Sequence, residues 1–204
     1  MLDLLRAWLF PSACAGCDAL GPGLCARCAP TLHDAIDFEV DGIPAFALGA
    51  YDGPLRRAIV AVKHGERDPL EPLAELLAAR APVIGALVPV STSRSRRAER
   101  GFDQSVELAR RVAQRRGLPC VESLHKHGSA QDGRSRAARL RATDRFRLGA
   151  CAELPPLVTL LDDVCTTGAT ASDAVRTLAA AGVTVRRLVF LARTAPDRHT
   201  TTTP

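Results

Sequence analysis

The amino-acid sequence predicts an α/β domain built on a mostly parallel central sheet, with a small cysteine-rich segment before it. Residues 84–90 and 157–161 are short, continuous apolar runs, typical of strands buried on both faces of a parallel sheet. Helical patterns follow both runs, and this alternation of strand and helix favours the α/β class. The 204 residues leave room for one such domain and a small appendage.

Apolar periodicity places the other elements. The further predicted strands are short apolar runs: residues 45–51, 119–124 and 184–193. The predicted helices carry an apolar stripe at helical spacing: residues 55–63, 71–81, 104–116 and 171–181. Gly65 ends the first of these helices, and Gly117 caps the third at its C-terminus. Residues 33–42 form a linker or a short acidic strand, and residues 1–10 form a short amphipathic helix.

Composition and charge narrow the function classes. Aromatic residues make up only 4% of the chain, which argues against a surface that stacks on many bases. The net charge is +5, and basic residues are concentrated between Ser91 and Arg147. This basic middle suggests a polyanionic ligand, although a solvated arginine-rich surface would account for part of it. No apolar run approaches the roughly 20 residues that span a membrane, and seven cysteines without an export signal predict a reducing, cytoplasmic location.

Four cysteines predict a metal site. Cys14, Cys17, Cys25 and Cys28 form two pairs with the CxxC spacing, and closely spaced glycines allow the tight turns between them. Four thiolates suit a closed tetrahedral Zn²⁺ site, which would be structural because no coordination position stays open. The alternatives are a pair of disulfides or a redox-active CxxC.

The central prediction concerns residues 157–170. A strand, a short polar turn and a helix N-terminus together form an anion site, because free N–H groups and the helix dipole favour phosphate. The hydroxyls and the backbone that would bind it belong to consecutive residues: Thr166, Thr167, Gly168, Ala169 and Thr170. Asp162 and Asp163 precede them and would repel a bare phosphate, but they would bind sugar hydroxyls, either directly by hydrogen bonds or through a bound cation. The stretch therefore predicts a site for a phosphorylated ribose; the alternative is an ordinary surface turn with a capping threonine.

The loop after residues 84–90 is a candidate pyrophosphate site. It mixes hydroxyls with arginines directly after a strand, where open α/β sheets bind ligands, and arginine binds phosphate oxygens bidentately. The candidates are Ser91, Arg94, Arg97 and Arg100, with Lys63 reaching in from the first helix. Residues 125–147 are polar and rich in arginine, which fits either a lid over the ligand or plain disorder. Cys165 is interpreted as a small buried hydrophobic residue rather than a reactive thiolate.

Residues 158–170 resemble the phosphoribosyl pyrophosphate signature of the type I phosphoribosyltransferases. The order of motifs extends this resemblance to the ComF family (ComF/GntX type) over nearly the whole chain. The motifs are the cysteine ribbon, residues 51–56, residues 88–90, residues 100–105 and the sugar loop. The resemblance implies a zinc ribbon joined to a type I phosphoribosyltransferase fold, and a link to natural transformation and the handling of single-stranded DNA. One branch of the family is tied to gluconate use.

Three positions depart from the family pattern. Asp103 stands where Asn is usual, Ser91 where Pro is usual, and Ala142 where an Asn is usual. These changes leave the sugar site intact and bear on the acceptor side of the reaction. The resemblance implies displacement of pyrophosphate at the anomeric carbon of ribose, with Mg²⁺ on the leaving group. No residue stands out as a general base, so the catalytic residue and the acceptor stay unassigned.

The predicted organisation has three parts: residues 1–42 hold the N-terminal helix and zinc ribbon, residues 43–194 the phosphoribosyltransferase-like domain, and residues 195–204 a disordered tail. The expected ligand is phosphoribosyl pyrophosphate or a related sugar phosphate. Single-stranded DNA and competence proteins are the family-implied partners, and the oligomeric state is left open, with a homodimer as one option. The alternative to an enzyme is a non-catalytic nucleotide-sensing or DNA-processing adaptor that retains the sugar-phosphate pocket.

Overall fold

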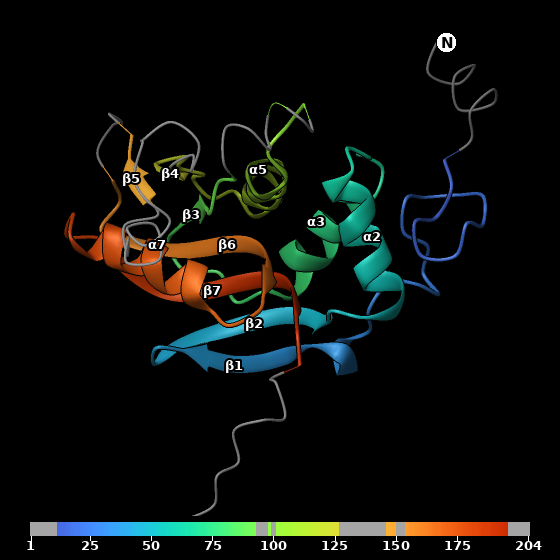
Figure 1. The fold of residues 1–204 in the computed structure, drawn as a ribbon, viewed down its shortest axis with the longest axis horizontal. Helices are drawn as coiled ribbons and strands as arrows, with labels where there is room; N and C mark the ends of the chain where they lie inside the picture. The colour runs from blue at the N-terminus through green and yellow to red at the C-terminus, as the bar shows by residue number, and fades with distance from the viewer. Residues whose placement is uncertain (1–11, 93–97, 99–100, 127–145, 150–153, 196–204) are drawn as a thin grey trace, which may run out of the picture.

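The computed structural model describes residues 12–92, 98, 101–126, 146–149 and 154–195. Within them a twisted five-stranded sheet runs through the molecule, with helices on both of its faces (Figure 1). The predicted helix over residues 1–10 lies outside the described residues, as do most of residues 125–147 and all but the first residue of the tail. No helix in the described ranges is long and apolar enough to cross a membrane.

The sheet has the strand order β1-β2-β7-β6-β3. The four parallel strands are β2 (Ile43–Ala50), β7 (Thr184–Arg193), β6 (Leu157–Cys165) and β3 (Ala86–Pro89). Strand β1 (Ile36–Val40) runs antiparallel to β2 at one edge. The mostly parallel α/β sheet that the sequence predicts is therefore confirmed. At the carboxyl ends of β3 and β6, the Val90 N–H donates to the Leu161 carbonyl at 2.9 Å, so the two strand ends lie side by side.

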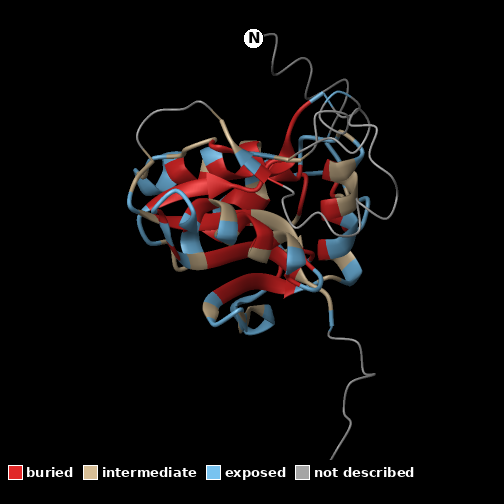
Figure 2. Cartoon of the chain, turned by 60° about the vertical axis from the view of Figure 1, so that its left-hand side comes forward, coloured by how far each residue is buried: buried red, intermediate tan, exposed pale blue. Residues whose placement is uncertain are grey.

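Alternating side chains divide the core into two layers. On one face, Leu161 and Val189 pack with residues of α2 (Gly53–Lys63), α3 (Leu70–Arg80) and α5 (Gln104–Arg116). On the other face, the neighbouring strand residues Leu160 and Leu188 pack against α7 (Ala169–Ala179). Figure 2 shows the strands as a continuous buried layer between these helices. The unalternating apolar runs in the sequence follow from this burial on both faces.

Local signals set the ends of two elements. Helix α5 and strand β7 match the predicted residues 104–116 and 184–193. Helix α5 begins where the Asp103 carboxylate accepts a hydrogen bond from the Val106 N–H at 3.3 Å, and it ends at Gly117 with a φ of 63°. An N-cap acid and a left-handed glycine are the expected start and stop signals of a helix.

Strand β6 is longer than its apolar run. It continues past Leu161 through the acid pair to Cys165, because β7 keeps pairing with it up to the partners Cys165 and Arg193. The two acids therefore lie inside the strand, and not after it as the sequence suggested. Helix α7 correspondingly begins at Ala169 instead of residue 171.

Smaller elements complete the fold. A short 3-10 helix covers Leu32–Asp34, and β4 (Leu124–Lys126) pairs with β5 (Phe146–Leu148) in a separate two-stranded sheet. In place of a strand over residues 119–124, a single bridge joins Cys120 to Leu87 before β4 begins. Residues 33–42 resolve into the acidic strand β1, which was one of the two expected options.

Candidate functional site

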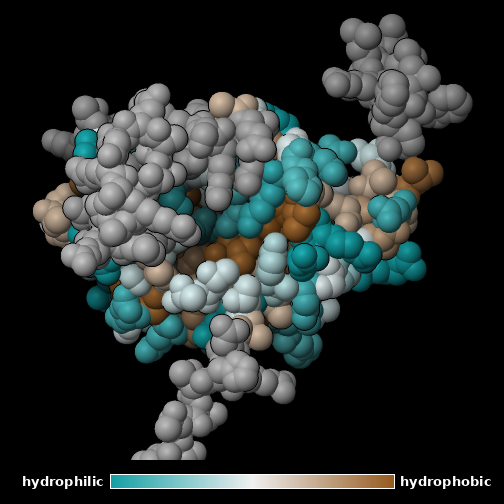
Figure 3. Space-filling model, in the orientation of Figure 1, coloured by the Kyte–Doolittle hydropathy of each residue, from teal (hydrophilic) through white to brown (hydrophobic). Residues whose placement is uncertain are grey.

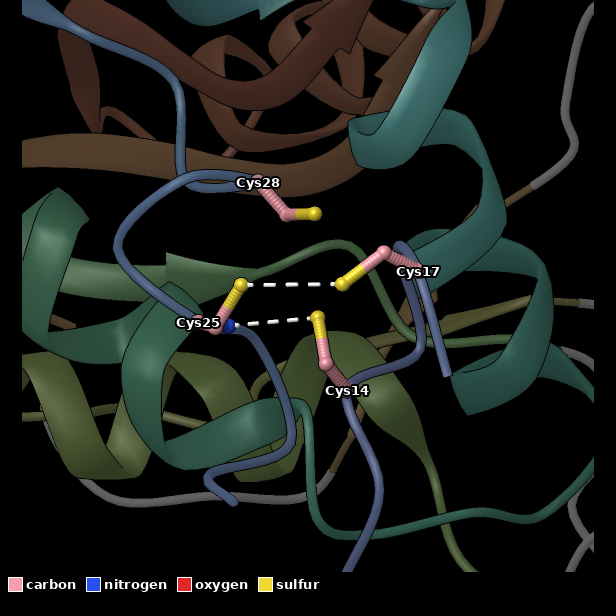
Figure 4. A group of neighbouring side chains, drawn as sticks. All are labelled: Cys14, Cys17, Cys25 and Cys28. Carbon is pink, nitrogen blue, oxygen red and sulfur yellow. Dashed lines mark hydrogen bonds between the residues drawn. The ribbon is translucent and has the colours of Figure 1, made fainter. Parts of the chain in front are cut away.

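The four cysteines of the N-terminal segment converge on one point. The sulfur atoms of Cys14, Cys17, Cys25 and Cys28 all lie within 4.8 Å of one another, and Figure 4 shows their side chains grouped around a common centre. The Cys17 and Cys25 Sγ atoms are 3.8 Å apart. A tetrahedral zinc ion with Zn–S bonds of about 2.3 Å separates its ligands by roughly this distance. The cluster could therefore bind a zinc ion.

The electrostatics of the cluster favour a bound cation. The N–H groups of Gly16 and Cys25 each donate to the Cys14 Sγ at 3.3 Å. Burial raises the pKa of the Cys14 thiol, but these hydrogen bonds outweigh it and lower the pKa to about 6. Burial and the neighbouring cysteine side chains raise the pKa of Cys28 to about 12. All four thiols can ionise together only if a positive ion compensates their charge.

The cysteine segment packs closely on α2 and the connection to α3. A Cβ on Gly16 would lie 2.7 Å from the Cys28 Cβ and 3.0 Å from the Pro54 Cβ, and one on Gly23 would lie 2.2 Å from the carbonyl carbon of Asp68. Glycine is therefore favoured at both contacts, because the side chains of Cys28 and Pro54 lie against Gly16 and the backbone of Asp68 lies against Gly23. Cys14, Leu24 and Cys28 belong to the same hydrophobic cluster as the inner residues of α2 and α3.

The acid pair lies at the carboxyl end of β6, where it meets the start of α5. Asp163 lines a small apolar cavity between α2, α3 and α5; its other lining residues are Ile59, Val62, Leu70, Gln104, Leu108 and Leu191. Figure 3 shows that this side of the molecule is hollowed near its centre, with hydrophobic residues at the bottom and hydrophilic residues around them. Asp163 therefore sits beside this cavity, at the end of the sheet where α/β proteins bind ligands.

Asp162 is half-buried and held by two donors on one oxygen. Its Oδ1 accepts hydrogen bonds from the Ser105 hydroxyl at 3.2 Å and from the Asp163 N–H at 2.8 Å. Burial raises the pKa of Asp162, the negative charge of Asp163 raises it further, and together they bring it to about 8, although Lys126 opposes this shift. Within the described residues no donor contacts Oδ2, so that oxygen is available to a ligand hydroxyl.

Asp163 has a different environment. Its Oδ2 accepts a hydrogen bond from Gln104 Nε2 at 2.7 Å and forms an ion pair with Lys63 Nζ at 3.1 Å, while Oδ1 accepts the Val164 N–H at 2.6 Å. Lys63, the last residue of α2, therefore contacts Asp163, and its role at a pyrophosphate stays a prediction. Its ammonium also lies 5.8 Å from the centre of the Tyr51 ring.

The start of α5 fixes the neighbouring loop as well. Asp103 Oδ2 accepts hydrogen bonds from the N–H of Thr92 at 2.7 Å and from its hydroxyl at 3.2 Å, while Oδ1 accepts from Val106. All three partners are donors, which suits a carboxylate, since the amide of an Asn would turn an NH₂ toward one of them. Thr92 therefore provides two donors that favour Asp over Asn at position 103.

The proposed phosphate loop is open at its tip. Thr166, Thr167 and Ala169 are exposed and Thr170 is half-buried. Gly168 has a φ of 80°, and a Cβ there would lie 2.7 Å from the Val40 Cγ1, so both conformation and packing require glycine. The Ala169 N–H donates to the Thr167 hydroxyl at 3.4 Å. The next N–H groups of α7, those of Thr170 and Ala171, have no partner within the helix, which suits an anion.

Other predicted site residues fall into two groups. Ser91 is buried directly after β3, beside the acid-bearing end of β6. Arg94, Arg97 and Arg100 lie outside the described residues. Cys165 is buried, and burial raises the pKa of its thiol, which favours the small hydrophobic residue over the reactive thiolate.

Sequence reasoning missed three residues at the site: Gln104, Ser105 and Lys126. Gln104 and Ser105 belong to the first turn of α5, and they contact acids far away in the chain. The available signal was their position at a predicted helix start directly after a polar loop that follows a strand. Lys126 ends β4, an element that the sequence did not delimit.

The comparisons with known proteins give likenesses among solved structures only. No protein-family model matches the chain, and no curated protein matches its sequence. Among solved structures, the chain is similar to an orotate phosphoribosyltransferase from Aeropyrum pernix, with 16% sequence identity and a TM-score of 0.41. The alignment covers 82% of this chain and 80% of that chain. A likeness of this extent does not bear on the site.

Proposed function

We propose that the protein binds phosphoribosyl pyrophosphate, or a closely related sugar phosphate, and acts as a phosphoribosyltransferase. The observation that carries this proposal is the placement of two carboxylates and an open threonine-rich loop on one strand–loop–helix unit. The acids accept ribose hydroxyls, and the backbone and hydroxyls of residues 166–170 bind the 5′-phosphate. The resemblance of this unit to the phosphoribosyltransferase signature supports the same ligand.

The reaction that follows from this ligand is substitution at the anomeric carbon. An acceptor nucleophile forms a bond to that carbon while the bond to pyrophosphate breaks, and pyrophosphate leaves with the bonding electron pair. Lys63 provides one described cation at the site, and the arginines of the loop after β3 would add others. Mg²⁺ would contribute charge neutralisation on the pyrophosphate when bound with it.

Titration calorimetry of the full chain with phosphoribosyl pyrophosphate tests the binding. We expect a Mg²⁺-dependent interaction that weakens by at least about tenfold in Asp162→Ala, because the free carboxylate oxygen is lost. Asp37→Ala is the matched control, since Asp37 is an exposed acid on a strand of the same sheet. Equal binding by wild type and Asp162→Ala would contradict the proposed site.

Turnover is a separate question from binding. We expect wild type to release pyrophosphate from phosphoribosyl pyrophosphate when a suitable nucleobase acceptor is present, and a panel of bases would identify the acceptor. Binding without release across the panel would favour the alternative, a sensing or adaptor protein that retains the pocket.

The ComF resemblance extends the proposal to single-stranded DNA and competence partners in the cytoplasm. The basic residues between Ser91 and Arg147 suit a phosphate backbone, so DNA binding should weaken steeply with added salt. Binding that survives Asp162→Ala/Asp163→Ala would show that DNA uses a surface separate from the sugar pocket. Sedimentation analysis of the same samples would show whether a homodimer forms.

The cysteine ribbon is proposed to hold one structural zinc ion. Four sulfurs within 4.8 Å of one another fill a tetrahedral coordination sphere, so the ion would have no open position for chemistry. Metal analysis should therefore give about one zinc per chain, and Cys14→Ala should reduce it. A metal-free chain with a native melting temperature would contradict a structural role.

A further inference from the structure

Three successive residues at the start of α5 each hold a different part of the site. Asp103 binds Thr92 on the loop after β3, Gln104 donates to Asp163, and Ser105 donates to Asp162. All three are buried. One helical turn therefore links the candidate pyrophosphate loop to both acids, and it does so from a helix whose start is fixed by its own N-cap.

Gln104 and Lys63 contact the same oxygen of Asp163, but Gln104 is neutral and Lys63 is charged. Lys63 and Gln104 both contact Oδ2 of Asp163, at 3.1 Å and 2.7 Å. The lysine is a long cation at the end of a helix, with a side chain that is 27% exposed. The glutamine is 5% exposed, and its amide is neutral.

The two partners should respond differently to a phosphorylated ligand. An anionic group entering the site competes with Asp163 for the Lys63 ammonium, because both are negative. The neutral Gln104 amide would gain much less by moving from Asp163 to the anion. Its hydrogen bond to Asp163 can therefore persist when the ligand binds. Asp163 then keeps its orientation only through Gln104 and the backbone N–H of Val164.

We propose that Gln104 is a positioning residue that keeps Asp163 aimed at one sugar hydroxyl, and that it thereby makes the site selective for ribose phosphates over a deoxyribose phosphate. This inference rests on the proposed function above, because it concerns the same pocket. The two acids divide the vicinal hydroxyls: Asp162 offers its free Oδ2 to one, and Asp163 serves the other. A site built to pair with a hydroxyl discriminates strongly against an analogue that lacks it, because the acceptor is then left unpaired.

The test compares Gln104→Met with Gln114→Met. Both changes replace an amide by an unbranched apolar side chain on the same helix, but Gln114 is exposed and distant from the acids in the helix sequence. Calorimetry measures the dissociation constants for ribose 5-phosphate, 2-deoxyribose 5-phosphate and 3-deoxyribose 5-phosphate. Wild type and Gln114→Met should prefer ribose 5-phosphate over each deoxy sugar by about tenfold or more.

Gln104→Met should lose its preference over one deoxy sugar and retain its preference over the other, because only the hydroxyl at Asp163 is affected. A loss of affinity that is equal for all three sugars, or an unchanged preference, would overturn the inference while leaving the proposed function in place. Absence of ribose 5-phosphate binding by wild type would overturn this inference, and absence of phosphoribosyl pyrophosphate binding as well would overturn the proposed function. If Gln104→Met fails to fold, Gln104→Ala gives the same test, since it removes the amide donor without introducing a charge.

Discussion

Removing the charge of Asp162 is expected to stabilise the protein, and to do so increasingly as the pH rises. Burial, followed by the charge of Asp163, raises the pKa of Asp162 to about 8. In Asp162→Asn, the amide oxygen can still accept the hydrogen bonds from Ser105 and the Asp163 N–H, but the side chain cannot ionise. Comparing Asp162→Asn with wild type therefore measures the free energy that ionisation of Asp162 costs the folded protein.

The size of the effect follows from proton linkage. An unfolded aspartate has a pKa of about 3.9, so between that pH and about 8 the unfolded chain binds fewer protons than the folded chain. The free energy of unfolding of wild type therefore falls as the pH rises through this window, by at most about 1.4 kcal/mol per pH unit. The slope flattens as the pH approaches 8, because Asp162 itself then ionises in the folded protein. The variant should gain about 2 kcal/mol over wild type between pH 6 and 8.

The assay is urea denaturation of wild type, Asp162→Asn and the exposed control Asp37→Asn, at pH 6, 7, 8 and 9 in the presence of zinc. Comparing each variant with wild type at the same pH cancels the titration of groups that they share. The advantage of Asp162→Asn should grow up to about pH 8 and then level off, because both states of wild type are ionised above that pH. An advantage that is constant from pH 6 to 8 would refute the reasoning, since it would mean that Asp162 ionises normally in the folded protein.

Three further predictions concern the elements around the site. Gly23→Ala should lower the free energy of unfolding by about 2 kcal/mol in urea titrations, because its Cβ would overlap the backbone of Asp68; an unchanged midpoint would mean that the ribbon does not pack there. Chelation of zinc should lower the melting temperature of wild type more than that of Cys14→Ala, as measured by calorimetry, because the variant has already lost a ligand. Asp103→Asn should cost about 1 kcal/mol in the same urea assay, since its amide would face an N–H donor of Thr92 or Val106; a variant as stable as wild type would contradict the assigned hydrogen bonds.

Elements with strong local signals could be predicted from the sequence to the residue. Helix α5 lies between an N-cap acid and a left-handed glycine, and β7 contains the apolar run Leu188–Ala192, which is buried on both faces. The end of β6 could not be found in this way. Its last residues are polar or half-buried, and they stay in the strand only because β7 pairs with them up to Arg193.

The residues of the candidate site also fall into those that the sequence could predict and those that it could not. The acids and the threonine loop are neighbours in the chain, so one stretch of sequence contains their signal. The hydrogen bonds of Gln104 and Ser105 to these acids join residues 59 and 57 positions apart. No local pattern encodes which side chain of α5 reaches which acid, because that depends on how the helix packs on the sheet.

The cysteine segment has a consequence for how the protein depends on its metal supply. Its buried sulfurs share a hydrophobic cluster with α2, and α2 ends at the lysine that is paired with Asp163. We expect a chain deprived of zinc to lose the support beneath that helix, and with it the fixed position of the lysine. A shortage of zinc would then lower the affinity of the site at Asp163 for its sugar phosphate, although zinc binds elsewhere in the protein.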